Sequence, residues 1–426
     1  MAQFFNVLPP DEARTHWLAE ITHRTASLQD ADALERAIMQ REPVIVDEAP
    51  SPEDLPAFRR SSVDGYAVRA ADTFGASESL PAYLTVIGEA RMGERPDIQI
   101  GPGLTALIHT GAMLPDGADA VVMVENTQQA AENEIEVLRR AAPGENVIQI
   151  GEDVRKGETI LPAGSRLRPQ DIGALLALGF GSRANPLTIR ARPRMAIFST
   201  GDEVIPPAQT PQPGQIRDIN SHTIGALAAD AGAVPERGGI VPDRPEALHT
   251  ALREAYLSSA DIITVTAGSS VSVRDMTADV INRLAKEFGG PGVLVHGVAM
   301  KPGKPTILAA VGGRPVLGLP GNPVSAMVAF WLFGVPVVYH VMGARMPLRP
   351  HVRAELTANV PGAAGRVDHV PVVLHTDGDT IRAEPIFGKS NLIFTLVRAD
   401  GILKVPLDAT GLRAGEMGDV YFFQGG

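Results

Sequence analysis

The sequence predicts a multidomain protein with a doubly wound α/β domain in its central third. The main observation is the alternation of apolar, β-branched runs with amphipathic runs between residues 191 and 340. Residues 1–190 instead mix short helices with short strand-like runs, and residues 346–426 contain strand-like runs separated by turn residues. At about 100–200 residues per domain, 426 residues allow roughly two to four domains. We therefore expect a mixed N-terminal region, the α/β domain and a small C-terminal β-domain.

Apolar periodicity places the elements of the central region. Apolar or β-branched runs predict strands, at residues 195–199, 261–266, 293–298, 306–311 and 315–319. Amphipathic runs predict helices at residues 220–231 and 276–288. Gly312-Gly313 lies between the last two strands and predicts a hairpin turn. Sheets of this class bind ligands in the crevice beyond the carboxyl ends of their strands.

The N-terminal region offers fewer elements with a clear pattern. Apolar spacing predicts a helix over residues 32–40, and residues 169–178 predict another helix that Gly179 closes. Short apolar runs predict strands at residues 104–108 and 120–124.

Composition excludes several classes of function. The net charge of −11 argues against general nucleic-acid binding, which needs a basic face. The absence of cysteine removes disulfides, thiolate metal sites and cysteine nucleophiles. His109, His222 and His296 are far apart, so zinc is not expected. The GxSxG, GxGxxG and GxxxxGK[ST] patterns are absent, which leaves hydrolase, dinucleotide and P-loop sites without support.

No targeting signal is apparent. The first residues lack a basic segment followed by an apolar run, and the longest apolar segment, residues 324–341, is interrupted by Gly334 and Pro336. We therefore expect a cytoplasmic protein with no membrane contact.

Four loops lie where the α/β rule places a ligand: residues 199–203, 267–270, 301–305 and 320–323. Their small residues let a ligand approach the backbone, and their amides and hydroxyls can donate to phosphate or oxyanion oxygens. The candidate binding residues in these loops are Thr200, Gly201, Asp202, Gly268, Ser270, Lys301, Lys304, Pro320, Gly321, Asn322 and Pro323.

For two of these loops a purely structural role is an alternative to ligand binding. Asn322 is a good N-cap and Pro323 a good first helical residue, so a helix would start there and aim its amides at the crevice. The same pair can simply be a well-made helix start. Lys301 and Lys304 flank a rigid Pro-Gly turn and would offset an anion, or they can be solvated loop lysines.

Five carboxylates lie in or near similar loop sequences: Asp64, Asp153, Glu203, Asp243 and Asp275. Such groups beside a phosphate site hold Mg²⁺ or orient water. Each has a structural alternative: Asp243 has capping-box spacing to Glu246, Asp275 can cap the following helix, and Asp64 can satisfy a turn. Spacing alone does not assemble them into one site.

At these loops the chain resembles the molybdopterin molybdenumtransferase family, known as MoeA in bacteria and as the gephyrin E domain in animals. The matching motifs are Ser62-Val63-Asp64-Gly65-Tyr66-Ala67, His109-Thr110-Gly111-Ala112, Gly117-Ala118-Asp119-Ala120-Val121-Val122, Gly151-Glu152-Asp153-Val154, Ser199 to Glu203, Ile216-Arg217-Asp218 with Asn220, Lys301 to Pro305, and Gly318 to Ser325. Each motif alone is weak, but their common order covers nearly the whole chain.

The resemblance implies a fold and an assembly. It implies two subdomains within residues 1–190, one of them inserted at about residues 46–147. It also implies a molybdopterin-binding α/β domain at residues 191–340 and a β-barrel at residues 346–426. The family is homodimeric, with a site shared between the α/β domain of one subunit and an N-terminal subdomain of the other. Asp64 and Thr110 would then belong with Glu203.

The resemblance also implies a reaction. Molybdate enters the dithiolene of adenylylated molybdopterin, the adenylyl group is cleaved with Mg²⁺, and molybdenum cofactor and AMP are released. The five carboxylates are the implied catalytic residues, and Glu203, Asp243 and Asp275 the implied Mg²⁺ ligands. Arg366 and Ser390 are implied anion contacts. Implied partners are the molybdopterin adenylyltransferase and acceptor molybdoenzymes, both in transient contact.

One loop departs from the family pattern: Ala267 and Ser272 replace glycines and Met276 replaces tyrosine. If the loop keeps positive φ at those glycines, each substitution stores about 1–2 kcal/mol of strain. The departure suggests one alternative to the enzyme, a scaffold paralogue that kept the fold and lost turnover. A separate alternative keeps catalysis and uses tungstate, because sequence does not separate two tetrahedral oxyanions of nearly equal size. Asp275 is retained, which favours the enzyme.

Overall fold

The computed structural model describes residues 7–30, 44–181, 186–267 and 271–423, with the backbone alone for residues 271–274. The chain divides into two compact units. The first comprises residues 1–46, 163–172 and 181–426, and the second residues 47–162 and 173–180. The helix predicted at residues 32–40 lies outside the described residues.

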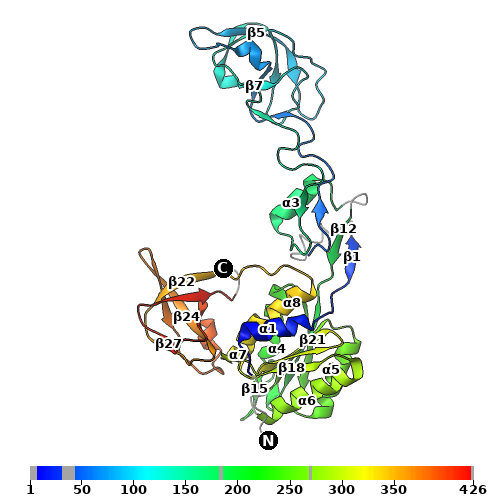
Figure 1. Cartoon of the computed structure of the whole chain (residues 1–426), viewed down its shortest axis with the longest axis vertical. Helices are drawn as coiled ribbons and strands as arrows, with labels where there is room; N and C mark the ends of the chain where they lie inside the picture. Colours follow the sequence, from blue (N-terminus) through cyan, green and yellow to red (C-terminus); the bar gives the residue numbers. More distant parts are fainter. Residues whose placement is uncertain (1–6, 31–43, 182–185, 268–270, 424–426) are drawn as a thin grey trace. The chain divides into compact units, whose positions relative to one another are not determined.

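A six-stranded sheet forms the centre of the first unit, in the order β16-β13-β17-β21-β20-β18 (Figure 1). Its strands are β13 (Arg194–Thr200), β16 (Val234–Val241), β17 (Ile262–Ala267), β18 (Gly292–His296), β20 (Ile307–Val311) and β21 (Arg314–Pro320). The four strands from β16 to β21 are parallel, whereas β20 is antiparallel to both of its neighbours. The predicted hairpin is confirmed, and Gly312 and Gly313 both have the positive φ, 55° and 75°, that its tight turn needs. Strand β16 was not predicted, because Pro235, Glu236 and two glycines hide its pattern.

Helices cover both faces of this sheet, which confirms the doubly wound class. The helices α1 (Pro10–Ala19), α4 (Asn220–Asp230), α7 (Pro323–Ala329) and α8 (Val335–Val341) pack against one face. The helices α5 (Pro245–Leu257) and α6 (Val271–Phe288) lie side by side against the other (Figure 1). Alternate residues of β13 serve the two layers, with Ile197 on the α4 side and Phe198 on the α5 side.

The segment from α7 to α8 is a core element. Among the described residues, Pro323–Val341 is the one helix long and apolar enough to cross a membrane, but 83% of it is buried inside the protein. A π-helical turn, Phe330–Gly334, joins α7 to α8, and Pro336 follows it in the first turn of α8. Phe330 and Phe333 are fully buried against the sheet.

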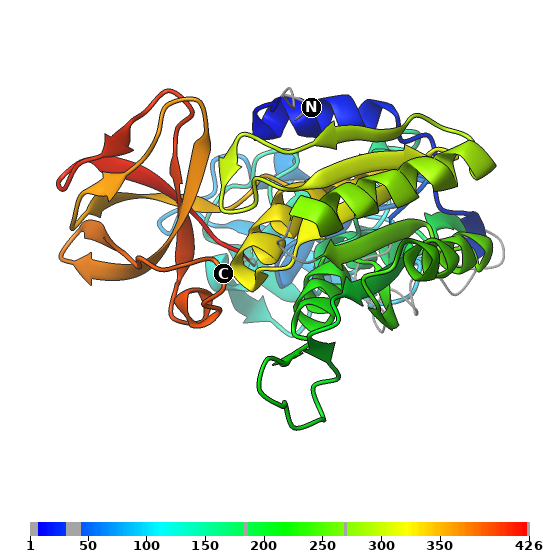
Figure 2. The same ribbon diagram turned by 90° about the horizontal axis from the view of Figure 1, so that it is seen from below.

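The C-terminal part of the first unit is a closed barrel, seen as the orange and red strands in Figure 2. Its strands are β22 (His351–Leu356), β24 (Val367–Asp377), β25 (Thr380–Pro385), β26 (Gly401–Val405) and β28 (Met417–Tyr421). The pairing of β24 with both β25 and β26 closes the ring. Strand β19 (Met300–Lys301) pairs with β24 and joins the barrel to the α/β domain. This confirms the predicted C-terminal β-domain.

The second unit is built on another six-stranded sheet, in the order β7-β4-β6-β5-β9-β8. Its strands are β4 (Gly65–Val68), β5 (Ala82–Ala90), β6 (Leu104–Ile108), β7 (Ala120–Met123), β8 (Thr127–Ala131) and β9 (Glu134–Val137). The two strands predicted from apolar runs are β6 and β7. The predicted helix before Gly179 is α3 (Pro169–Ala177), and Gly179 has the positive φ of 71° expected of a helix stop.

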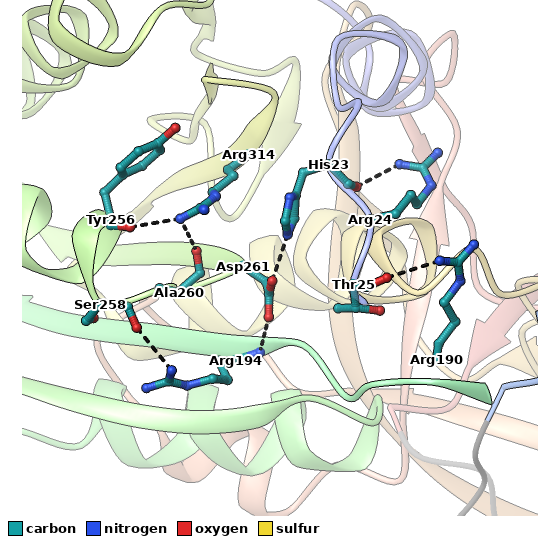
Figure 3. A network of polar contacts seen from close by, with 10 residues as sticks. All are labelled: His23, Arg24, Thr25, Arg190, Arg194, Tyr256, Ser258, Ala260, Asp261 and Arg314. Atoms are coloured by element: carbon teal, nitrogen blue, oxygen red, sulfur yellow. Dashed lines mark hydrogen bonds and ion pairs between the residues drawn. The ribbon is translucent and has the colours of Figure 1, made fainter. Parts of the chain in front are cut away.

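A polar network fixes the amino ends of β13 and β17 (Figure 3). The Asp261 carboxylate pairs with His23 at 2.7 Å and accepts from the backbone amide of Arg194 at 2.8 Å. The Arg314 guanidinium donates to the carbonyls of Tyr256 and Ala260. These contacts hold the segment after α1 against the sheet, at the end opposite the crevice.

Candidate functional site

The sheet order places a crevice at the carboxyl ends of β13 and β17. The chain leaves β13 toward β16 on one side and returns to β17 on the other, which makes this a topological switch point. The loops after β13, β16, β17 and β21 therefore meet at one edge of the sheet. They bring together the predicted stretch Thr200 to Glu203, Asp243, and the turn from Pro320 to Pro323. Gly268 and Ser270 lie outside the described residues.

A buried polar network supports the floor of this crevice. The Asp218 carboxylate, 7% exposed, accepts hydrogen bonds from the Ser199 hydroxyl at 2.8 Å and from the amide and hydroxyl of Ser221 at 3.1 and 2.5 Å. Thr266, near the end of β17, donates to the Ser199 hydroxyl at 3.2 Å. Both strands that border the switch point are thus tied to the start of α4.

The start of α4 is also tied to the loop after β21, residues 320–323. The Asn220 side chain donates to the carbonyl of Gly321 at 2.8 Å. Neither Asp218 nor Asn220 was singled out as a site residue, although both belong to a motif that resembles the family's. The available signal was their place in that motif, since neighbouring polar residues such as Arg217 and His222 give no sign that these two side chains are buried.

Carboxylates gather above this floor at the end of β16. Burial raises the pKa of Asp243 above its ordinary value, and the neighbouring carboxylates Glu203 and Asp202 raise it further, against the Thr200 hydroxyl, which lowers it. Within the described part of the chain, Asp243 Oδ1 and Thr200 Oγ1 are buried and make no hydrogen bond of good geometry. A buried carboxylate oxygen without a donor is costly, and a cation or a ligand donor at this point would relieve that cost.

Two capping alternatives are wrong. The N-cap of α5 is Arg244, and no side chain caps that helix, so Asp243 does not form a capping box with Glu246. Helix α6 begins at Val271 rather than 276, so Asp275 lies within the helix and does not cap it. Asp275 is exposed. No group of three or more His, Asp or Glu side chains among the described residues is arranged to hold a metal, so the three predicted Mg²⁺ ligands do not form a preformed cage.

The glycine departures carry no backbone strain. Among the described residues the non-glycine positions with positive φ are Asn146 and Ser259, so neither Ala267 nor Ser272 meets the condition for stored strain. Ser272 instead lies in the first turn of α6. Gly201 does need to be glycine, because it has a φ of 142° and a Cβ there would lie 2.7 Å from Glu203 Oε2.

A second group of predicted residues lines a cavity of about 940 Å³, which we call the lysine cavity. It lies between the α/β domain and the barrel, and its lining includes Lys301, Lys304, Asn322, Arg366 and Ser390. Neither lysine has a carboxylate partner in the described ranges, whereas Arg366 forms a two-pronged pair with Asp368 at 2.7 and 3.1 Å. The cavity thus presents two uncompensated ammonium groups. Lys389 also lines it, although it was not among the predicted site residues.

The turn at Asn322 connects this cavity with the crevice. Asn322 is the N-cap of α7 and Pro323 its first residue, as predicted. The Asn322 side chain does not cap the helix but donates to the Ser390 hydroxyl at 3.0 Å, and the Val324 amide donates to the Ser390 carbonyl at 3.1 Å. The predicted helix start is confirmed, and the same turn also contacts the barrel. Anion binding at this turn stays a prediction.

The remaining predicted residues lie in the second unit. Asp64 accepts from the amide and the hydroxyl of Thr110 at 2.8 and 3.1 Å, and these contacts lower its pKa. Asp64 therefore links two distant loops rather than satisfying its own turn. His109 lies 3.8 Å from Asp64 and 3.0 Å from Glu89. Asp153 is exposed.

Comparison with known proteins identifies the family. Three family models match in order: the MoeA N-terminal region (domains I and II) at residues 8–179, a probable molybdopterin-binding domain at residues 196–340, and the MoeA C-terminal region (domain IV) at residues 353–423. The chain is 35% identical to molybdopterin molybdenumtransferase 2 of Mycobacterium tuberculosis over 86% of its own length and 88% of the relative's. The chain belongs to the molybdopterin molybdenumtransferase family. This confirms the resemblance found from the motifs.

Other members of the molybdopterin molybdenumtransferase family agree. The Bacillus subtilis molybdopterin molybdenumtransferase is 32% identical, with 85% of this chain and 83% of that protein covered. A crystal structure of the molybdopterin biosynthesis MoeA protein from Pyrococcus horikoshii OT3 superposes with a TM-score of 0.81 at 29% identity, covering 98% of this chain and all of that one. The family fold, with its central α/β domain and C-terminal barrel, is thus confirmed.

Proposed function

We propose that this transferase of molybdenum cofactor biosynthesis inserts molybdenum from molybdate into adenylylated molybdopterin and releases molybdenum cofactor and AMP. Family membership over most of the chain gives the class of enzyme and the pathway. One observation carries the assignment to this chain. The lysine cavity contains two lysines without carboxylate partners among the described residues, and the crevice is edged by carboxylates. A reaction of two polyanions needs both positive charge and a group that handles the displaced phosphate.

The loops of the crevice would hold the nucleotide-bearing pterin. Gly201 leaves room at the end of β13 for a ligand to approach the backbone, and the buried Asp218 network keeps that loop in place. Asn322 and Ser390 would orient the anionic end of the substrate at the mouth of the lysine cavity. Rigid positioning of both reactants contributes to rate by fixing the reacting atoms in contact.

The lysine cavity would hold molybdate. Lys301 and Lys304 supply charge, and Pro302 and Pro305 restrict the backbone that carries them. Arg366 is already paired with Asp368, so we assign it to shaping the cavity or to a shared contact with the oxyanion. In the forward step the two dithiolene sulfurs replace oxygen ligands of molybdate, which leave as water.

Mg²⁺ fits the acidic edge of the crevice as a partner of the substrate phosphate. Mg²⁺ is commonly held by one or two carboxylates together with phosphate oxygens and waters, so a preformed three-residue cage is not required. Asp243 offers a buried oxygen without a donor, and Glu203 is close enough to raise its pKa. We propose these two as the ligands, together with Asp275 of α6, and Asp153 of the second unit keeps its predicted catalytic role. Bound there, the ion would neutralise charge on the phosphoanhydride.

We also propose a cytoplasmic homodimer in which Asp64 and Thr110 of one subunit serve the site of the other. The support is the tight Asp64–Thr110 pair in the second unit, which has no role in that unit's core. The domain limits remain those predicted: 1–190, with an insertion at about 46–147, then 191–340 and 346–426. Transient contacts with the molybdopterin adenylyltransferase and with acceptor molybdoenzymes belong to the same proposal.

The test is AMP release by the purified chain from adenylylated molybdopterin, with and without molybdate and Mg²⁺. We expect release to require both ions. Tight binding of adenylylated molybdopterin with no AMP formed would favour the scaffold alternative. A second arm replaces molybdate with tungstate at equal concentration. Faster AMP release with tungstate would identify tungstate as the substrate.

A further inference from the structure

A second, smaller cavity lies apart from the crevice and the lysine cavity. Its volume is about 310 Å³, and we call it the Trp331 pocket. Its walls come from α1, from the π-helical turn, from the segment after α8 and from the barrel, with Arg14, Trp331, Arg349, His369, Lys404 and Tyr421 among the lining residues. The function proposed above uses none of them.

The central feature of this pocket is a half-buried arginine without an ion-pair partner among the described residues. In the described part of the chain the Arg349 guanidinium makes one hydrogen bond, to the carbonyl of Trp331 at 3.0 Å, and lies 4.3 Å from the centre of that indole ring. Burial lowers the pKa of Arg349 to about 10, and Arg14 contributes in the same direction. Arg349 is therefore still charged at neutral pH, with most of its five N–H donors free.

The charge around Arg349 is positive. Arg14 and Lys404 line the same pocket, and Asp11, the carboxylate in its described lining, is 70% exposed and pairs with Arg14 at 2.8 Å. An exposed ion pair of this kind contributes little free energy. A partly desolvated cation that no carboxylate contacts directly is costly, and a bound anion reduces that cost.

A buried histidine with an unsatisfied ring nitrogen lines the same pocket. His369 is 5% exposed, and its Nδ1 has no hydrogen-bond partner among the described residues. Burial lowers the pKa of His369 to about 3, and Lys404 and Arg349 add to this, so the ring is neutral at physiological pH. A neutral imidazole can donate to or accept from a ligand. The rings of Trp331 and Tyr421, 6.1 Å apart, give the pocket a flat apolar wall.

We propose that the Trp331 pocket binds a small organic anion that carries a carboxylate or phosphate group on a compact apolar body. The anionic group pairs with Arg349 and is within the field of Arg14 and Lys404. The apolar body lies against Trp331, and His369 makes a polar contact. Pockets for small ligands combine an apolar lining with a few fixed polar groups in this way.

The pocket also has a path to the substrate site. His369 lines both the Trp331 pocket and the lysine cavity, and its neighbour Asp368 holds Arg366 in the lysine cavity. Occupancy of the pocket is thus expected to change the affinity for molybdate, by the same factor that molybdate changes the affinity for the pocket ligand.

The test measures binding of benzoate and phenyl phosphate, with benzamide as the neutral analogue, by calorimetry on the full-length protein. We expect a Kd at or below about 1 mM for at least one acid and binding at least tenfold weaker for benzamide. The stronger acid identifies the anionic group. Emission of Trp331 should change with the same midpoint, since the other tryptophan, Trp17, is fully buried in α1 and does not line the pocket.

Variants locate the site. Arg349→Gln should weaken binding at least tenfold, and Arg14→Gln should weaken binding in a protein that keeps Arg349. Arg353→Gln is the matched control, because Arg353 is exposed on β22 and faces Asp419. Absence of binding by both acids at about 1 mM, equal binding by wild type and Arg349→Gln, or loss in Lys304→Ala with none in Arg349→Gln would each overturn the proposal.

Discussion

Replacing Asp218 with alanine tests whether the buried network holds the crevice together. The substitution removes the acceptor of three hydrogen bonds, from the Ser199 hydroxyl and from the amide and hydroxyl of Ser221. A buried donor left unsatisfied costs about 1–3 kcal/mol. Three donors, partly relieved by water that enters the space, set the loss of unfolding free energy at about 3–6 kcal/mol. That is a large fraction of the roughly 5–15 kcal/mol that stabilises a typical domain.

Asparagine at the same position is the matched comparison. It keeps the shape and one acceptor oxygen, and the Ser221 hydroxyl can turn to accept from the new amide group. Asp218→Asn should therefore cost about 1–2 kcal/mol, the difference between charged and neutral hydrogen bonds. Asp379→Asn, on an exposed turn, should change stability by less than about 0.5 kcal/mol.

Denaturant unfolding measures the stability of these variants, and AMP release below their melting temperatures measures function. Because the network reaches the ends of β13 and β17, we expect kcat/KM to fall more in Asp218→Ala than in Asp218→Asn. Equal destabilisation by alanine and asparagine, or a loss below about 1 kcal/mol for alanine, would refute the reasoning.

Three further predictions follow from the site. Asp243→Asn should abolish turnover yet stabilise the fold at neutral pH by up to about 1 kcal/mol. The reason is that the pKa of Asp243 is raised in the folded protein, so the wild type loses stability as pH rises from 3.8 through the folded pKa. A stability difference between the two proteins that shrinks as pH rises would contradict this. Lys301→Ala and Lys304→Ala should each raise the molybdate concentration required for turnover about 10- to 150-fold, whereas replacing the exposed Lys286 of α6 with alanine should not. Equal molybdate dependence in all three variants would show that the cavity lysines are ordinary surface residues. Ala267→Gly and Ser272→Gly should each destabilise by about 0.5–1 kcal/mol, because glycine there gains backbone freedom in the unfolded chain and relieves no strain; higher melting temperatures would show that strain is present after all.

The sequence predicted local structure correctly where a residue type strongly favours one backbone conformation. The paired glycines 312 and 313 permit the positive φ of a tight hairpin, and Asn322-Pro323 can begin a helix, so both were predicted correctly. Strand β16 was missed because an edge strand with exposed polar residues lacks the apolar pattern of a buried one. The start of α6 was placed five residues late, because Ser272 and Arg274 interrupt its apolar periodicity.

The site was predictable as a set of loops, and its polar contacts were not. Parallel strands bring their carboxyl ends together, so the loops after β13 and β21 were expected to meet. The sequence could not show that Asp218 is buried beneath them, since burial depends on how α4 packs on the sheet. The same limit applies to Asp243, whose spacing to Glu246 suggested a cap that the backbone at Arg244 does not form.

The most direct test of the central claim is transfer of molybdenum by the purified chain to a usable product. The chain is mixed with adenylylated molybdopterin, molybdate and Mg²⁺, and the released cofactor is added to an apo-molybdoenzyme while AMP is quantified. We expect about one AMP for each molybdenum atom recovered in active enzyme, with both signals lost together in Glu203→Gln. AMP formed without active cofactor, or active cofactor formed equally well without the chain, would contradict the account.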